Sequence, residues 1–293
     1  MNLILDEVTI PILSYNKGEN NNSIKICAEL KEDKYKDIIK KHPSVITIED
    51  ENFYDMSFIS YYETDNKSFF VFSNNKNFKD TLTKEEIYEI NDIIANIINL
   101  LNNREIPEKY NNFLQKLTYK TASSIEINKL CGYTMLSKDW IDDLANWLNN
   151  KKVLEIGAGT GALASQLLKR NIDIIAIDNR SWDRFNWKDE STQWTKVLNE
   201  DYFEVYEKYL DRDIIILSYP IQGSYSYELL KLIREKNPSS LIIYIGPFKE
   251  DYVDKNFIEN VNLIKDEDFQ KISDKYFYWI GQPYMSSKLL LLK

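Results

Sequence analysis

Three of the chain's eight glycines stand within five positions, in the stretch VLEIGAGTGALA at residues 153–164. Gly157, Gly159 and Gly161 follow a short apolar run and precede an apolar pattern with helical spacing. A glycine lets a ligand approach the backbone where a Cβ atom would block it, and the free N–H groups at a helix N-terminus attract polar groups. The spacing therefore predicts a ligand-binding turn between a strand and a helix.

A carboxylate follows this turn at a distance that is typical of nucleoside-binding folds. Asp178 stands 21 residues after Gly157, at the end of the apolar stretch DIIAID, where its oxygens can accept hydrogen bonds from a ribose. The stretch GAGTGA satisfies the dinucleotide pattern G-x-G-x-x-[GA] and also the pattern [ED]-x-G-x-G-x-G. The glycines by themselves therefore leave both NAD and S-adenosylmethionine open as the ligand.

The stretch LEIGAGTGALA, with Glu155 two positions before the first glycine, resembles the class I S-adenosylmethionine-dependent methyltransferases. The resemblance covers about residues 121–293 and says almost nothing about the substrate. It implies an α/β fold, with a Rossmann-like, seven-stranded, mostly parallel sheet that ends in an antiparallel hairpin at YFYWIGQPYMSSKLLLLK. A nicotinamide dehydrogenase would more often continue into further βαβ units or a substrate domain.

The same resemblance implies roles for individual residues in binding S-adenosylmethionine. Asp178 would hold the ribose hydroxyls, and Asp201 would approach the adenine amine. The residues that would lie along the methionine part of the cofactor are Glu155, Gly157, Ala158, Gly159 and Gly161.

Ser218 and Tyr219 are the candidate catalytic residues, because many methyltransferases place the end of the fourth strand at the reacting centre. That strand ends here in LSYPI, which is similar to the [DNS]-P-P-[YFW] signature of amino-methylating enzymes only at Ser218 and Pro220. The alternative interpretation is that LSYPI has no role in the reaction and is only a strand end that is closed by Pro220. Methyl transfer is an in-line displacement that depends mostly on orientation and a dehydrated pocket, so a chain whose single histidine is His42 can perform it.

The composition argues against several other kinds of protein. A formal net charge of −9 opposes a main role in coating nucleic acid or an anionic membrane, because such partners are bound by clustered Lys and Arg. Cys27 and Cys131 stand far apart without histidine partners, so neither a metal site nor a disulfide framework is expected. No stretch approaches the ~18 apolar residues that span a bilayer, and the start MNLILDEVTI is unlike a signal peptide. A cytoplasmic location is therefore expected.

Two domains are predicted from the change in hydrophobic period along the chain. Residues 1–120 carry short strand patterns and, from Thr83, an amphipathic helix, which indicates a smaller α+β domain that selects or positions the acceptor. Residues 121–293 begin with two helices separated at Gly132, and after Asn150 apolar strands alternate with helices. Strands this continuously apolar are typical of a parallel sheet that is buried on both faces.

Aromatic residues add a further candidate surface. Tyr133 precedes the first strand of the second domain and would close over the cofactor, or else simply pack. The segment between Asp178 and Asp201 carries four aromatic residues, Trp182, Phe185, Trp187 and Trp194. These side chains would stack on adenine or form the floor of a substrate pocket, or else they would cover one face of the sheet.

The sequence as a whole predicts an S-adenosylmethionine-dependent methyltransferase whose acceptor is a small molecule or a peptide or protein. Three alternatives stay open at this point: an NAD-dependent oxidoreductase, a nucleic-acid methyltransferase, and a noncatalytic cofactor-binding module.

Overall fold

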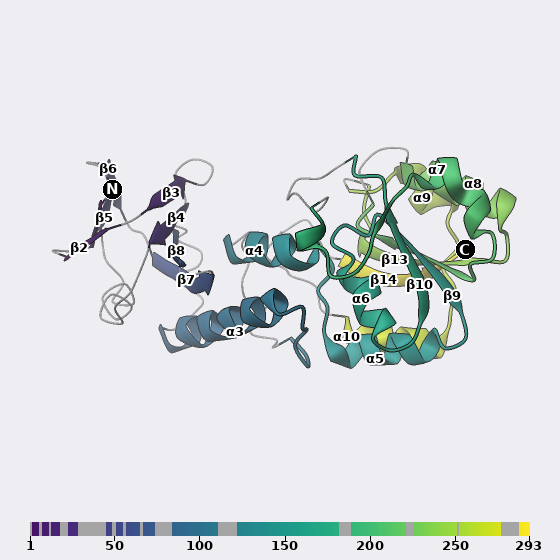
Figure 1. The fold of residues 1–293 in the computed structure, drawn as a ribbon, viewed down its shortest axis with the longest axis horizontal. Coiled ribbons are helices and arrows are strands. Elements are labelled where there is room, and N and C mark those ends of the chain that lie inside the picture. The colour runs from purple at the N-terminus through teal and green to yellow at the C-terminus, as the bar shows by residue number, and fades with distance from the viewer. Residues whose placement is uncertain are drawn as a thin grey trace. The chain divides into compact units, whose positions relative to one another are not determined.

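The computed structural model of the chain describes residues 2–5, 8–11, 13–17, 23–28, 45–48, 51–54, 57–64, 67–73, 84–110, 122–181, 189–220, 225–250, 252–276 and 287–293. The chain divides into two compact units, one of residues 1–99 and 120–126 and one of residues 100–119 and 127–293. Figure 1 shows the elements of both. None of the helices in these ranges combines the length and the apolar character needed to cross a membrane.

The first unit is built from short antiparallel strands. One sheet has the order β2-β1-β5-β6, with β1 (Asn2–Leu5), β2 (Val8–Pro11), β5 (Val45–Ile48) and β6 (Glu51–Tyr54). A second sheet has the order β3-β4-β8-β7, with β3 (Ser14–Lys17), β4 (Ser23–Ala28), β7 (Ser57–Thr64) and β8 (Lys67–Ser73). The helix α3 (Lys84–Asn102) follows these strands in the chain.

The second unit contains a sheet of six described strands in the order β11-β10-β9-β12-β13-β14. Their bounds are β9 (Lys152–Ile156), β10 (Asp173–Asp178), β11 (Leu198–Asn199), β12 (Ile214–Ser218), β13 (Leu241–Pro247) and β14 (Ser287–Leu292). All neighbouring strands are parallel except β13 and β14, which pair antiparallel. The predicted α/β class with a mostly parallel sheet is confirmed. Residues 277–286, in which the other strand of the hairpin is predicted, are outside the described ones, so the seven-stranded sheet and its hairpin stay predictions.

The strand order places a crevice beside β9. The chain passes from β9 to β10 on one side of it and later returns to β12 on its other side. The connections that leave the carboxyl ends of β9 and β12 therefore diverge, and in open α/β sheets ligands bind in the crevice at such a point. The glycine turn that the sequence singled out follows β9 directly.

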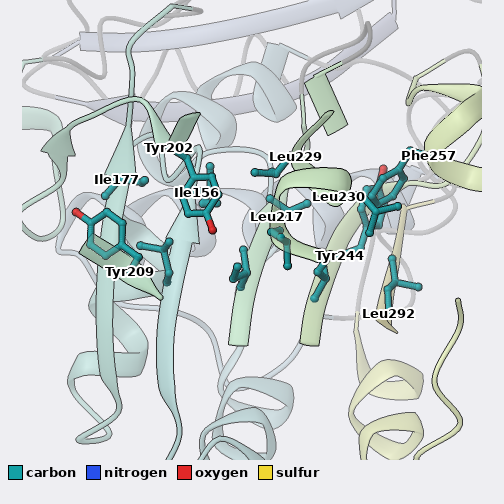
Figure 2. Close-up of a cluster of buried hydrophobic side chains, with 14 of the residues drawn as sticks. Ile156, Ile177, Tyr202, Tyr209, Leu217, Leu229, Leu230, Tyr244, Phe257 and Leu292 are labelled. Atoms are coloured by element: carbon teal, nitrogen blue, oxygen red, sulfur yellow. The ribbon is translucent and has the colours of Figure 1, made fainter. Parts of the chain in front are cut away.

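Helices cover both faces of this sheet (Figure 1). One face carries α5 (Lys138–Trp147), α6 (Ala162–Leu168) and α10 (Glu267–Lys275), and the other carries α7 (Tyr202–Val205), α8 (Tyr225–Lys236) and α9 (Lys255–Asn260). Alternate residues of each strand face opposite layers. Figure 2 shows Ile156, Leu217 and Tyr244 of the strands packed beneath Leu229 of α8 and Phe257 of α9. Each large apolar side chain buried in this way contributes about 1.5–3 kcal/mol.

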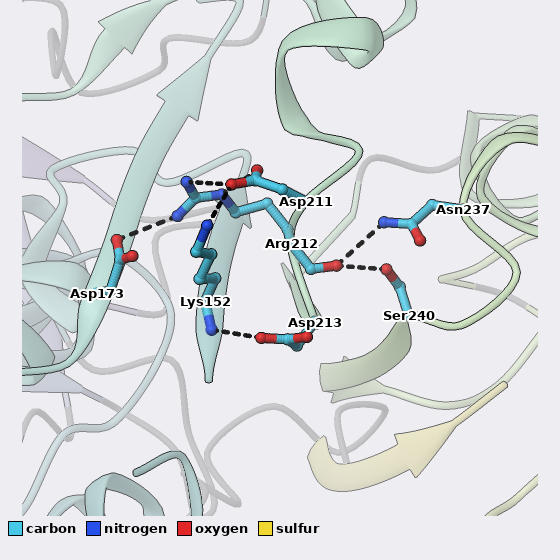
Figure 3. Close-up of polar contacts among 7 residues, drawn as sticks. All are labelled: Lys152, Asp173, Asp211, Arg212, Asp213, Asn237 and Ser240. Atoms are coloured by element: carbon cyan, nitrogen blue, oxygen red, sulfur yellow. Dashed lines mark hydrogen bonds and ion pairs between the residues drawn. The ribbon is translucent and has the colours of Figure 1, made fainter. Parts of the chain in front are cut away.

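A polar network joins the strands at the opposite edge from the glycine turn (Figure 3). The Arg212 guanidinium donates to Asp173 across 3.1 Å and to Asp211 across 3.1 Å. The Arg212 carbonyl accepts from the Asn237 amide at 3.0 Å and from the Ser240 hydroxyl at 2.5 Å. These contacts hold together the segments that enter β10, β12 and β13, so we interpret this charged cluster as structural.

Candidate functional site

The glycine loop joins β9 to α6 at the carboxyl edge of the sheet. Gly157, Gly159 and Gly161 have φ angles of 71°, 55° and 69°, a region that side chains disfavour. The N–H groups of Gly157 and Ala158 donate to the Ile177 carbonyl in β10, at 3.0 and 3.1 Å. A Cβ atom added to Gly157 would meet nothing within 4 Å. The loop is thus pinned to β10 on one side and open at Gly157 on the other.

Gly161 has different surroundings from the other two glycines. A Cβ atom there would come within 2.7 Å of the Val197 side chain and within 3.2 Å of Thr195. Gly161 begins α6 as its N-cap residue, and it does not belong to the residues that line the pocket. Its missing side chain therefore makes room for the segment that carries Val197.

Asp178 lies at the end of β10, as the sequence predicted, and its carboxylate fixes the glycine loop. Oδ2 accepts the N–H of Gly159 at 2.8 Å, and Oδ1 accepts the N–H of Arg180 at 2.8 Å. The Arg180 guanidinium in turn donates to the Gly159 carbonyl at 2.9 Å. Asp178 lines the pocket, and each of its oxygens has a second lone pair for a ligand hydroxyl.

Glu155 is a buried carboxyl group that also lines the pocket, with 2% of its surface exposed. Its Oε2 accepts the N–H of Ala164 in α6 at 3.1 Å. Burial raises the pKa of Glu155 to about 8, the Ala164 N–H lowers it, and the Asp178 carboxylate raises it further. A positive charge placed in the pocket would favour the ionised form of this group.

The pocket lies between the glycine loop and a second wall, of which the sequence indicated only Tyr133. That wall is the segment Cys131–Thr134, which follows α4 (Ala122–Cys131) and includes Tyr133. The end of β12, Glu200 and Tyr225 of α8 also line the pocket. The pocket thus brings together Glu155, Gly157, Ala158, Gly159, Asp178, Ser218 and Tyr219 out of the predicted site residues.

Ser218 and Tyr219 stand where β12 leaves the sheet. The Ser218 hydroxyl is buried and makes no hydrogen bond within the described part of the chain. Tyr219 has a φ of 48°, a conformation that costs a residue with a side chain about 1–2 kcal/mol. It is held there by its N–H, which donates to Ile245 across 2.7 Å, and by its hydroxyl, which shares a hydrogen bond of 2.6 Å with Ser287.

The ring of Tyr219 also packs on that of Tyr133, with centroids 5.5 Å apart and an angle of 36° between the planes. This contact joins the end of β12 to the Cys131–Thr134 wall. Burial raises the pKa of the Tyr219 phenol above its ordinary value of 10, so the phenol is protonated at neutral pH. Tyr219 therefore stands at this end of the pocket as a neutral side chain whose hydroxyl is engaged with Ser287.

Asp201 lies beside the pocket but does not line it. Its Oδ1 accepts the N–H of Phe203 at 2.9 Å as the cap of α7, and its Oδ2 accepts the Asn179 amide at 2.8 Å. The preceding residue, Glu200, does line the pocket. Hydrogen bonds from Tyr209 and Lys208 lower the pKa of Glu200, so it carries a negative charge. The sequence signal for Glu200 was only its place next to Asp201.

Trp194 packs rather than lining the pocket. Only 8% of its surface is exposed, and both of its N–H groups are engaged: the backbone donates to Thr160 at 2.8 Å and the indole to Leu130 at 2.6 Å. Of the two interpretations of the aromatic segment, packing is the one that holds for Trp194. Trp182, Phe185 and Trp187 lie outside the described residues.

Comparisons with known proteins point to methyltransferases. No known family model matches the chain. A stretch of 43 residues is 44% identical to the ubiquinone biosynthesis O-methyltransferases of Acinetobacter baumannii and Acinetobacter baylyi. This stretch makes up 15% of this chain and 18% of each relative. The chain thus matches less than a fifth of the length of these curated relatives.

Solved structures to which the chain is similar include two further methyltransferases. The B. subtilis M1A22 tRNA methyltransferase TrmK is 18% identical with a TM-score of 0.32, over 54% of this chain and 66% of that one. A coclaurine N-methyltransferase bound to N-methylheliamine and S-adenosylhomocysteine is 16% identical with a TM-score of 0.31, over 64% of this chain and 70% of that one.

Proposed function

We propose that this chain is an S-adenosylmethionine-dependent methyltransferase that acts on a small molecule or on a peptide or protein. The observation that carries the proposal is the open backbone at Gly157 beside the fixed carboxylate of Asp178, at the switch point of a parallel sheet. The open side of Gly157 is a cradle that any side chain would fill, and an adenosyl ligand needs both a bare backbone and a ribose acceptor.

The charges around the pocket fit a cationic ligand. Three carboxyl groups line it, from Glu155, Asp178 and Glu200. A sulfonium ion carries a positive charge that the carboxylates of Asp178 and Glu200 attract, and the same charge would favour ionisation of Glu155, which burial otherwise keeps mostly protonated at neutral pH. We assign Glu155, Gly157, Ala158 and Gly159 to the methionine part of the cofactor and Asp178 to the ribose.

The adenine end of the cofactor is assigned to the residues after β11. Asp201 remains the proposed partner of the adenine amine, and Glu200 is the neighbouring carboxylate that already lines the pocket. Because the Asp201 side chain caps α7 and binds Asn179, its approach to adenine requires one of those contacts to be shared. Gly161 contributes by admitting Val197 against the loop, rather than by direct approach to a ligand.

Ser218 and Tyr219 are proposed to face the acceptor. When bound, S-adenosylmethionine would supply a methyl group attached to a positively charged sulfur. A lone pair of the acceptor would displace this methyl group from the sulfur, which keeps the electrons of the carbon–sulfur bond. The buried Ser218 hydroxyl, which has no hydrogen-bond partner among the described residues, can orient the attacking atom, and the rings of Tyr219 and Tyr133 exclude water on that side. The first unit is proposed to select or position the acceptor.

The direct test is transfer of a labelled methyl group. The purified chain is incubated with S-adenosylmethionine carrying a tritiated methyl group and with fractions of a cell extract, and the labelled product is identified by mass spectrometry. Label in a small molecule or a peptide, lost in an Asp178→Ala variant, supports the proposal. Label in nucleic acid would replace the proposed acceptor class, and bound cofactor without transfer would indicate a noncatalytic module.

A further inference from the structure

The segment Asp189–Val197 runs from the short helix η3 (Glu190–Thr192) to the edge of the glycine loop. Asp189 caps η3 by accepting the N–H of Ser191 at 2.9 Å. The Ser191 carbonyl accepts the Arg104 guanidinium at 3.1 Å. The Gln193 side chain accepts the N–H of Val197 at 3.3 Å, which closes the segment on itself. This segment is therefore held at several points, although it has little regular secondary structure.

Trp194 lies at the centre of this segment and binds the backbone on both sides of the pocket. Its own N–H donates to the carbonyl of Thr160, the residue after Gly159 in the glycine loop. Its indole Nε1 donates to the carbonyl of Leu130, in the last turn of α4. The residue after Leu130 is Cys131, where the second wall of the pocket begins.

The carbonyl that accepts the indole is one that the helix cannot satisfy. The last four carbonyls of a helix have no partner within it and must find one elsewhere. In α4, the Asn128 carbonyl accepts the N–H of Gly132 at 2.9 Å, and the Leu130 carbonyl accepts Trp194. The indole N–H thus satisfies a carbonyl in the last turn of α4, directly before the segment Cys131–Thr134.

A second contact fastens the same segment to the glycine loop. The Val197 side chain occupies the space where Gly161 would carry a Cβ atom. Because Gly161 starts α6 and follows Thr160, Trp194 and Val197 hold consecutive residues of the loop.

We propose that Trp194 is a positioning residue that sets the spacing between the glycine loop and the Cys131–Thr134 wall. This inference rests on the proposed function, because the spacing is tested through the affinity for S-adenosylhomocysteine, which is the product of that reaction. Trp194 acts through the backbone of Thr160 and Leu130 and touches no ligand itself.

The test is a Trp194→Phe variant, which keeps an aromatic ring and the backbone N–H and removes the indole donor to Leu130 together with part of the ring volume. We expect the affinity for S-adenosylhomocysteine, measured by titration calorimetry well below the melting temperature, to fall roughly threefold to tenfold, as for one lost hydrogen bond. We also expect hydrogen exchange at residues 131–134 of the free protein to become faster than in the wild type.

Trp147→Phe is the matched control, because Trp147 lies in α5 away from the pocket and its indole donates to Asp266 at 3.3 Å. It loses an indole hydrogen bond and the same ring volume in the same unit, although its acceptor is the Asp266 carboxylate and not a backbone carbonyl. Its melting temperature should fall by a similar amount, while its affinity for S-adenosylhomocysteine and its exchange at residues 131–134 should equal those of the wild type. A merely structural Trp194 would behave in the same way as this control.

The outcomes separate this inference from the proposed function. Wild-type binding with unchanged affinity and exchange in Trp194→Phe overturns the inference and leaves the function standing. A wild type that binds no S-adenosylhomocysteine overturns the function, and the exchange measurement then decides alone whether Trp194 fixes the wall. If Trp194→Phe does not fold, Val197→Ala replaces it: a smaller loss of affinity with faster exchange supports the inference, and wild-type values for both overturn it.

Discussion

The carboxylate of Asp178 accepts the backbone N–H of Gly159 across 2.8 Å, so the group proposed to bind the ribose also fixes the loop proposed to bind the methionine part. The two roles are linked through one side chain. A ligand that bridges β9 and β10 therefore meets a loop whose position is set before it binds, which lowers the entropy cost of binding.

Replacement of Asp178 should weaken ligand binding in two steps. Asp178→Asn keeps an oxygen that can accept one of the two backbone N–H groups, whereas Asp178→Ala keeps none. We expect Asp178→Ala to lose roughly 1.5–3 kcal/mol of affinity for S-adenosylhomocysteine and Asp178→Asn to lose less. The affinities are measured by calorimetry, with Asp254→Ala as the control. Asp254 is an aspartate that accepts the N–H of Asn256 as the cap of α9, so this variant loses an aspartate–backbone hydrogen bond away from the proposed ligand. Equal affinities in all four proteins would refute the ribose assignment.

The glycines should respond differently to the same substitution. Gly161→Ala places a Cβ atom 2.7 Å from the Val197 side chain and so should lower the melting temperature markedly. Gly157→Ala meets no atom within 4 Å, so its cost to stability is limited to about 1–2 kcal/mol for a side chain at positive φ. Gly157→Ala should instead abolish most of the affinity for S-adenosylhomocysteine. The opposite order, with Gly157→Ala binding normally, would mean that no ligand lies against that glycine.

Glu155 makes the stability of the protein depend on pH. Its pKa in the folded protein is about 8 against an ordinary value of 4.5, so the folded state holds a proton that the unfolded state releases. The contribution is fully present below about pH 4.5 and is lost as the pH rises to about 8, with about 1.4 kcal/mol for each pKa unit of difference. Glu155→Gln cannot ionise and can still accept the N–H of Ala164. Denaturant unfolding at pH 5 and pH 8 should therefore show the variant gaining stability relative to the wild type as the pH rises. The same difference in the free energy of unfolding at both pH values would contradict a buried protonated Glu155.

Ser218→Ala should separate transfer from binding. The Ser218 hydroxyl has no hydrogen-bond partner in the described residues, so its removal should leave the melting temperature and the affinity for S-adenosylhomocysteine close to wild type. Incorporation of the labelled methyl group should fall, because the acceptor loses the group proposed to orient it. Transfer at the wild-type rate would favour the simpler interpretation of this site as the end of a strand closed by Pro220.

The sequence predicted those parts of the site that a local pattern determines. A strand, a glycine turn and a helix follow one another within residues 152–168, and Asp178 ends the next strand, so the spacing alone placed them at one edge of the sheet. The sequence also predicted a strand at the C-terminal SKLLLLK, which the structure has as β14, but it did not predict that this strand pairs antiparallel with β13.

The parts that could not be predicted depend on contacts between distant residues. Trp194 binds Leu130 from 64 positions away, and nothing local indicates which of the four aromatic residues in that segment does so. Gly161 was grouped with the other glycines, although Val197 explains its missing side chain. The choice between Glu200 and Asp201 depends on which carboxylate caps α7, a one-residue difference that the hydrophobic pattern does not determine.

The central claim is tested most directly by titration calorimetry of the wild-type chain with S-adenosylhomocysteine and, separately, with NADH. We predict saturable binding of S-adenosylhomocysteine at one site per chain, and no binding of NADH at the same concentrations. Binding of NADH without binding of S-adenosylhomocysteine would contradict the account, because the crevice beside Gly157 and Asp178 would then hold a dinucleotide.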